Sequence, residues 1–290
     1  MSDTRPVVVT GRFGRLGRAL ATTSPTPTKG WDQPELDLDD PPACAALVRA
    51  ARPGLVIHTA AMTAVDQAAR EPEVALRRNG DATGAIAAAC REVGCDLVVI
   101  STNEVFDGER RDGRGYTEDE PTGPRNPYGA SKLAGEVAAR RAFGAAPGLY
   151  IVRTAWLYGP PGGDFPDKIT AAADGAEGPL SVVSDEIGSP TYAVDLARAI
   201  WELAARVEGG TFHLVNAGAA SRLEWARAVL DVRRPGRATR PISASEFVRA
   251  SEPPRWGILD TSRAAAVGVT MRPWQEALTE YLHQERDQRR

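Results

Sequence analysis

Tyr128 and Lys132 are the two residues of this sequence whose side chains and spacing most directly suggest chemistry. They lie four positions apart in the stretch NPYGASKLAGE, residues 126–136. A helix places positions i and i+4 on one side, so it would bring the phenol and the ammonium together. An ammonium nearby lowers a phenol pKa from its usual value of about 10, which makes the tyrosine a better proton donor. The alternative is an incidental pair on a solvated helix.

Lysine is rare in this chain, which carries 35 lysines and arginines together. Only Lys29, Lys132 and Lys168 are lysines. A compact ammonium can reach the ribose hydroxyls of a cofactor, a task that suits a wide guanidinium less well. The choice of lysine at position 132 therefore favours a role beside a bound cofactor.

Three glycines form a turn between a predicted strand and a predicted helix near the N-terminus. Gly11, Gly14 and Gly17 occur in VVVTGRFGRLGRAL. Glycine at such positions lets the chain turn tightly, lets a pyrophosphate approach the main chain, and lets helix and strand pack closely. The motif predicts a dinucleotide site, and the alternative is a glycine-rich turn that binds nothing.

The type of nicotinamide cofactor depends on the end of the second strand, which TPTKGWD predicts only weakly. A carboxylate there selects NAD by accepting hydrogen bonds from the ribose, and Asp32 is placed to do so. A cation selects the 2′-phosphate of NADP, and Arg12, Arg15 or Lys29 are candidates. We favour NADPH, with NADH as the alternative.

Thr102 ends the buried run DLVVIST, and the carboxyl ends of parallel strands are where ligands bind in a doubly wound sheet. Its hydroxyl there can bind a substrate carbonyl while Tyr128 donates a proton and a nicotinamide donates hydride. A local hydrogen-bonding turn is the other interpretation of Ser101 and Thr102.

Buried strand patterns alternate with helical patterns throughout the first half of the chain. This alternation predicts an α/β fold of the Rossmann type, a doubly wound parallel sheet with helices on both faces. After about residue 158 the pattern becomes less regular and richer in glycine and proline. We predict an NAD(P)-binding domain over 1–155 and a smaller, mixed, mainly substrate-binding part over 156–290, with about 189–216 returning to the first domain.

Composition limits the partners and the compartment. A net charge of −3 gives no general attraction to nucleic acid or to an anionic membrane. The three cysteines, Cys44, Cys90 and Cys95, lack disulfide or metal-binding spacing and are expected to be buried thiols. No leader or membrane-spanning run is found. We expect a cytoplasmic monomer or homodimer without a metal ion.

The chain resembles the extended short-chain dehydrogenase/reductases, and among them the dTDP-4-dehydrorhamnose reductase family. The resemblance covers nearly the whole length and implies transfer of hydride from NAD(P)H to the C4 ketone of a dTDP-linked 6-deoxy-hexulose, forming dTDP-L-rhamnose. The stretches that carry it are GRFGRLGRAL, ELDLDD, VIHTAAMTAVDQAAREPE, ISTNEVFDG, YTEDEPTGPRNPYGASKLAGE, IVRTAWLYG, IGSPTYAVDLA, GTFHLVNAG and RPWQEAL.

The resemblance also implies roles for individual residues. The catalytic group is Thr102, Tyr128 and Lys132. The implied cofactor contacts, besides Tyr128 and Lys132, are Gly11, Arg12, Phe13, Gly14, Arg15, Leu16 and Gly17 in the turn, Asp37 and Leu38 on the adenine side, and Ala60, Ala61 and Met62 in the loop beside the cofactor. The implied substrate contacts are Thr102, Asn103, Glu104 and Trp156. His58 and His213 are interpreted as core residues rather than bases.

The family usually has STDYVFDG where this chain has STNEVFDG. Asn103 loses a charge, and Glu104 places an anion where the family has an aromatic ring. Glu104 faces either the sugar or the solvent. The change leaves a 4-ketoreductase of another deoxysugar pathway as the first alternative. A non-catalytic regulatory subunit is the second, although such a subunit would be expected to lack the catalytic group, which is intact here.

Overall fold

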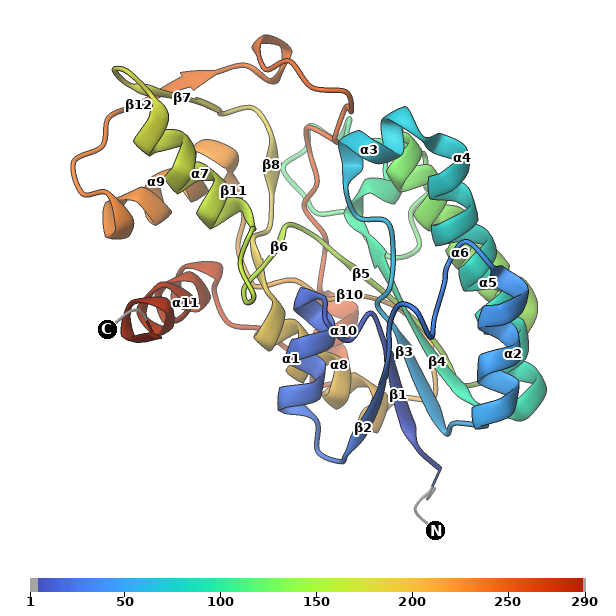
Figure 1. The fold of residues 1–290 in the computed structure, drawn as a ribbon. Coiled ribbons are helices and arrows are strands. Elements are labelled where there is room, and N and C mark those ends of the chain that lie inside the picture. The colour runs from blue at the N-terminus through green and yellow to red at the C-terminus, as the bar shows by residue number, and fades with distance from the viewer. Residues whose placement is uncertain (1–4, 289–290) are drawn as a thin grey trace.

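The computed structural model describes residues 5–288 and is built around a six-stranded sheet (Figure 1). All neighbouring strands pair in parallel, in the order β10-β5-β4-β3-β1-β2. The predicted doubly wound parallel sheet is confirmed. Strand β1 lies between β2 and β3, so the chain crosses to the other side of β1 when it runs from β2 to β3. Ligands bind where the strand order reverses in this way. The strands are β1, Val7–Thr10; β2, Thr28–Trp31; β3, Leu55–His58; β4, Asp96–Thr102; β5, Leu149–Thr154; and β10, Gly210–His213.

Helices cover both faces of the sheet (Figure 1). One face carries α1, Arg15–Thr23, and α8, Ala193–Arg206, while the other carries α2, Pro41–Ala51, α5, Ala82–Val93, and α6, Pro127–Phe143. Alternate strand residues enter the two cores, as Val8 and Val9 do in β1. The strands are apolar on both sides because neither face meets water.

Helix α6 begins where the sequence predicts it. Asn126 caps it, since its side-chain oxygen accepts a hydrogen bond from the Gly129 amide at 2.8 Å, and Pro127 occupies the first helical position. Gly144 ends the helix with a positive φ of 56°. These signals fix the helix that carries Tyr128 and Lys132.

The helical segment over residues 72–94 is interrupted. It consists of α4, Pro72–Ala75, a π-helical turn, Leu76–Asp81, and α5, and it follows the short α3, Val65–Arg70. The π turn presents Asn79, which bonds the Met62 amide at 2.8 Å, the Met62 carbonyl at 3.0 Å and the Ser131 hydroxyl at 3.0 Å. It thereby ties the loop after β3 to α6.

The C-terminal part is smaller and mixed, as predicted. Its strands pair in twos, β7 with β12 and β6 with β9 in parallel and β8 with β11 antiparallel. Its elements are β6, Leu157–Tyr158; α7, Phe165–Gly175; β7, Leu180–Val183; β8, Ile187–Gly188; β9, Thr191–Tyr192; β11, Ala220–Ser221; α9, Arg222–Arg233; β12, Thr239–Ile242; α10, Ser262–Ala266; α11, Trp274–Gln288; and the 3₁₀ turn Ala244–Glu246. Another 3₁₀ turn, Asn103–Val105, directly follows β4.

Several smaller expectations can be compared with the fold. The three cysteines are free and buried, as predicted. The histidines His58 and His213 are buried core residues, also as predicted. Within residues 5–288, no helix combines the length and the apolar character needed to cross a bilayer.

Candidate active site

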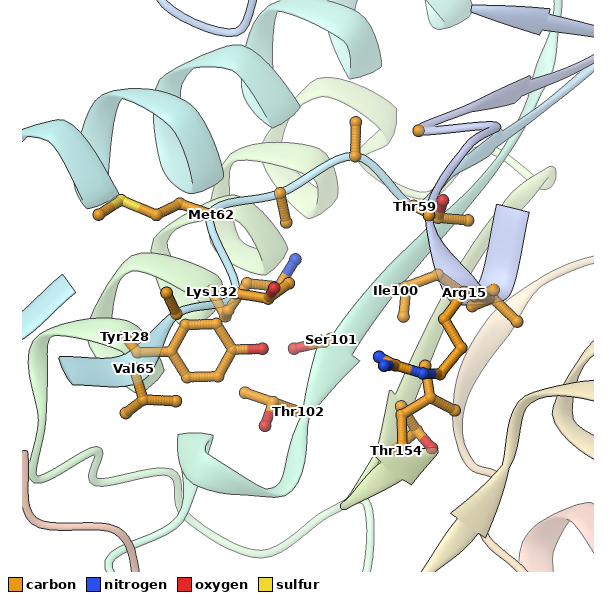
Figure 2. Close-up of a pocket in the computed structure, with 18 of the residues that line it drawn as sticks. Arg15, Thr59, Met62, Val65, Ile100, Ser101, Thr102, Tyr128, Lys132 and Thr154 are labelled. Atoms are coloured by element: carbon orange, nitrogen blue, oxygen red, sulfur yellow. The ribbon is translucent and has the colours of Figure 1, made fainter. Parts of the chain in front are cut away.

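A cavity of about 800 Å³ lies at the carboxyl ends of the sheet strands, facing the C-terminal part. The turns after β1, β3, β4 and β5 and helix α6 form one wall. Trp156, Phe165, Lys168 and Arg222 come from the C-terminal part and form the other. Figure 2 shows the side chains of Arg15, Tyr128 and Lys132 pointing into one space, with Thr102 beside Tyr128. The elements therefore bring the glycine turn and the Tyr-Lys pair into one cavity.

The glycine turn approaches the loop after β3 too closely for side chains. Gly11 has a φ of +65°, and a Cβ there would lie 2.9 Å from the Cα of Ala60. Gly14 caps α1 without a side-chain hydrogen bond, which leaves the start of that helix accessible to a ligand. Gly11, Gly14, Arg15 and Leu16 all line the cavity.

Four of the expected cofactor contacts do not line the cavity. Arg12 and Phe13 project outward, with the Arg12 guanidinium 4.5 Å from the centre of the Phe13 ring. Gly17 is buried against the turn, since a Cβ there would lie 2.2 Å from the Gly11 carbonyl oxygen, so its role is packing. The Asp37 carboxylate accepts a hydrogen bond from the Asp39 amide at 3.0 Å within its own turn. These four residues therefore lie outside the lining of the cavity, and their contact with a cofactor stays a prediction.

The other expected contacts line the cavity, namely Leu38, Ala60, Ala61 and Met62. Asp32 also lines it, at the end of β2, where its carboxylate accepts hydrogen bonds from the Phe13 amide at 3.1 Å and the Gln33 amide at 2.9 Å. Lys29 does not line the cavity and lies 3.9 Å from Glu35. The charge that the end of β2 offers is therefore negative.

Thr102, Tyr128 and Lys132 meet in the cavity, although the expected electrostatic effect on Tyr128 is wrong. Burial raises the pKa of the phenol above its usual range, the charge of Glu104 raises it further, and a hydrogen bond with Thr102 lowers it. Burial also lowers the pKa of Lys132 to about 8, against the opposing charge of Glu136. Lys132 is not among the causes of the shift, and the phenol keeps its proton at neutral pH.

A buried ion pair and a hydrogen bond to it fix the end of β4. The Ser101 hydroxyl donates to Glu136 at 2.5 Å, and Arg153 from β5 donates to the two carboxylate oxygens at 2.9 and 2.8 Å. Because the ion pair is bidentate, it fixes the position of the carboxylate. This arrangement joins β4, β5 and α6 directly beneath the side chains of the cavity.

The residues that depart from the family motif face in different directions. Asn103 donates to the Gly257 carbonyl at 3.2 Å and accepts from the Thr102 hydroxyl at 3.3 Å, so it links the strand end to the C-terminal part. Glu104 lines the cavity and accepts a hydrogen bond from the Asn126 amide group at 2.7 Å. Of its two expected orientations, the inward one is observed.

Trp156 lines the cavity, but its ring lies between two protein side chains. The guanidinium carbon of Arg222 is 3.6 Å from the ring centre, and the Trp225 ring stacks at 5.6 Å with an interplanar angle of 11°. Its backbone φ of 43° is unusual for a residue other than glycine. The group that covers the ring of Trp156 is therefore Arg222.

The sequence did not point to three basic residues of the cavity, Arg78, Lys168 and Arg222. Arg78 is paired with Asp39, whose pKa falls to about 2 through hydrogen bonds from Arg78 and Arg77. The rarity of lysine drew attention to Lys132, and the same signal could have identified Lys168. Arg222 lies 90 residues after Lys132 in a helix start, ASRLEW, whose recognisable signal is the helix capping box of Ser221 and Glu224 and not a ligand-binding motif.

Similarity to known proteins agrees with this geometry. The sequence profile of a family described as RmlD substrate binding domain matches residues 5–287. The chain belongs to this family. The dTDP-4-dehydrorhamnose reductase of Mycolicibacterium smegmatis is 39% identical over 281 residues, which are 94% of this chain and 83% of that protein. The resemblance stated from the sequence motifs is confirmed.

Two further members of similar size extend the comparison. The dTDP-4-keto-6-deoxy-D-glucose reductase of Streptomyces niveus is 36% identical and covers 94% of this chain and 95% of its own length. The solved dTDP-4-dehydrorhamnose reductase of Bacillus anthracis, in complex with NADP, superimposes with a TM-score of 0.88 at 33% identity, covering 97% of this chain and 100% of that one. The fold and the family are thus the same, while the named sugars differ.

Proposed function

We propose that this protein reduces the C4 ketone of a dTDP-linked 6-deoxy-4-hexulose with NADPH, and that its substrate is dTDP-4-dehydrorhamnose and its product dTDP-L-rhamnose. The observation that carries the proposal is the meeting of Thr102, Tyr128 and Lys132 in the same cavity as the glycine turn. The activity named for the M. smegmatis and B. anthracis relatives supports the choice of sugar.

The residues present fit a dinucleotide. Gly11 and Gly14 leave room for a pyrophosphate beside the start of α1, and Leu16, Leu38 and Met62 supply apolar surface in the same cavity. We assign these residues to the cofactor, together with Arg15, Ala60 and Ala61 as lining residues. When bound, the nicotinamide supplies hydride to the substrate.

Tyr128 is proposed to donate a proton to the oxygen formed from the ketone. Its raised pKa keeps the phenol protonated until the oxygen becomes basic enough to accept the proton. Thr102 holds the carbonyl by a hydrogen bond, and the charge of Lys132 stabilises the phenolate that remains. Lys132 is mainly protonated at pH 7 because its pKa is about 8.

The substrate diphosphate needs a cation on the C-terminal side of the cavity. Lys168 and Arg222 are the cations of that wall. Arg222 lies 3.6 Å from Glu186, whereas Lys168 forms no ion pair within 4.0 Å with any residue in 5–284. We therefore assign Lys168 to the diphosphate.

Two alternatives have different support. A 4-ketoreductase of another deoxysugar pathway is supported by the S. niveus relative and by Glu104, which departs from the family motif. A regulatory subunit has no comparable support, because the proposed catalytic side chains are intact and meet in the cavity. We further propose a cytoplasmic monomer or homodimer that binds neither nucleic acid nor membrane.

Turnover of NADPH with purified protein tests the proposal. Oxidation of NADPH is followed with dTDP-4-dehydrorhamnose and with dTDP-4-keto-6-deoxy-D-glucose. Higher kcat/KM for the first sugar supports the proposal, and higher kcat/KM for the second favours the alternative reductase. No turnover of either sugar favours the regulatory subunit.

Asp32 is expected to limit the preference for NADPH. Its carboxylate lies at the end of β2, where it would repel a 2′-phosphate and accept hydrogen bonds from an unphosphorylated ribose. An Asp32→Ser variant should raise the ratio of kcat/KM for NADPH to kcat/KM for NADH by about tenfold, as expected for about 1.4 kcal/mol of relieved repulsion. Steady-state kinetics with both cofactors measure the ratio, and Asp231→Ser, which changes an exposed carboxylate outside the cavity, is the control. An unchanged ratio in Asp32→Ser would show that Asp32 does not distinguish the 2′-phosphorylated ribose of NADPH from the ribose of NADH.

A further inference from the structure

Glu104 carries a carboxylate that lines the cavity beside Thr102, where the sugar is proposed to bind. It follows Thr102 by two residues in the 3₁₀ turn Asn103–Val105. Glu104 and Tyr128 line the same cavity, and after burial the charge of Glu104 is a further cause of the raised pKa of the phenol. The position is that of a residue that touches the substrate beside the reacting carbon, provided that the proposed function is correct.

One oxygen of this carboxylate is used by the protein. Asn126 donates to Oε2 of Glu104 at 2.7 Å, and the same Asn126 amide group donates to the Glu252 carbonyl at 3.1 Å. Asn126 is itself fixed as the cap of α6 through its side-chain oxygen. Among the residues that the structure describes, no other donor is bonded to the Glu104 carboxylate, so Oε1 is available to a ligand in the cavity.

A balanced group of charges surrounds the carboxylate. Burial raises the pKa of Glu104, the hydrogen bond from Asn126 and the charges of Arg222 and Arg249 act against this rise, and the charge of Glu186 adds to it. Arg222 lies 3.6 Å from Glu186, and Arg249 forms an ion pair with the other oxygen of Glu186. The two arginines thus offset part of the cost of burying the two carboxyl groups.

The position of Arg222 is set by the aromatic residues beneath it. Its guanidinium rests 3.6 Å from the centre of the Trp156 ring, which is backed by Trp225. Stacking of this kind holds a guanidinium in one orientation. The counter-charge of Glu104 is therefore part of the folded protein and does not have to come from the substrate.

We propose that Glu104 is a specificity-determining residue that accepts a hydrogen bond from the hydroxyl group at C3 of the sugar. Thr102 and Tyr128 are assigned to the oxygen at C4, and C3 is the neighbouring ring carbon that carries a hydroxyl in a 6-deoxy-4-hexulose. An ionised acceptor forms a strong hydrogen bond with a hydroxyl donor. A sugar that lacks this hydroxyl leaves the Glu104 carboxylate without its partner, which costs affinity in the transition state.

The test compares two sugars in two variants and a control. The sugars are dTDP-4-dehydrorhamnose and its 3-deoxy analogue, each with NADPH. The ratio of their kcat/KM values should be about 10- to 100-fold in the unmodified protein, the range expected for a hydrogen bond to a charged group. In Glu104→Ala the ratio should fall toward one. In Glu104→Gln, which keeps a neutral acceptor, it should lie between these values.

Glu109→Ala is the matched control, because Glu109 is an exposed carboxylate five residues further along and does not line the cavity. It should keep the ratio of the unmodified protein. Glu104→Gln also serves as the decisive variant if thermal melting shows that Glu104→Ala is unfolded. If all folded variants turned over both sugars with the same ratio of kcat/KM values as the unmodified protein, the proposal would be overturned. The reductase function would then remain intact. No turnover of either sugar by the unmodified protein would instead refute the function on which the proposal rests.

Discussion

A Tyr128→Phe variant is expected to lose about 10²- to 10⁴-fold in kcat while binding NADPH as tightly as the unmodified protein. The magnitude is that of a lost general acid. Phenylalanine keeps the ring of Tyr128 and removes only the hydroxyl, so the cavity wall remains. Stopped-flow or steady-state oxidation of NADPH measures kcat, and fluorescence titration measures cofactor affinity.

Tyr116→Phe provides the matched control for this experiment. Tyr116 is also a buried phenol, but its hydroxyl donates to Asp107 at 2.6 Å and it does not line the cavity. Its removal should affect stability rather than kcat. A kcat within twofold of the unmodified protein in Tyr128→Phe would contradict the assignment of Tyr128 as proton donor.

A Gly14→Val variant is expected to fold and to lose cofactor binding. Gly14 has a φ of −68°, which valine can adopt, and a Cβ there would meet only the Gly11 carbonyl oxygen, at 3.1 Å. The added side chain would occupy the space that a pyrophosphate needs beside the start of α1. Isothermal titration calorimetry with NADPH should show an affinity at least about 100-fold weaker, equivalent to about 2.7 kcal/mol.

Gly175→Val is the control for the glycine experiment. A Cβ at Gly175 would have no neighbour within 4 Å, and this residue ends α7 away from the cavity. Its cofactor affinity should equal that of the unmodified protein. If folded Gly14→Val protein bound NADPH with unchanged affinity, the assignment of this turn to the pyrophosphate would be wrong.

The sheet and its helices could be predicted from the sequence because their signals are local. Strands β1, β3, β4 and β5 are buried on both faces and appear as short apolar runs. Helix α6 has a cap, a proline and a terminal glycine at its ends. Strand β2 gave a weaker signal because it is an edge strand that contains Lys29 and Gly30.

The cavity could be predicted only in part. Gly11, Gly14, Thr102, Tyr128 and Lys132 belong to recognisable motifs near the ends of strands or the starts of helices, and all line the cavity. The orientation of a side chain within a turn is not encoded in this way. Arg12 and Phe13 therefore shared the motif of Gly11 and Gly14 but project outward.

The direction of the pKa shift of Tyr128 also could not be predicted from the sequence. The spacing of Tyr128 and Lys132 predicts proximity, and it predicted a lowered pKa for the phenol. Burial reverses the direction, and the charge of Glu104 adds to the effect. Glu104 in turn is compensated by Arg222 and Arg249, which enter from the C-terminal part. Such interactions depend on the tertiary fold, because the residues are more than 100 positions apart.

Hydride transfer to the sugar is the central claim, and an isotope experiment tests it most directly. Purified protein is incubated with dTDP-4-dehydrorhamnose and NADPH in which both hydrogens at C4 of the nicotinamide are replaced by deuterium, and the product is examined by mass spectrometry and NMR. The account predicts dTDP-L-rhamnose with one deuterium bound to C4 of the sugar, and no such product from Tyr128→Phe over the same time. Absence of deuterium from the sugar at full conversion, or no conversion by the unmodified protein, would contradict it.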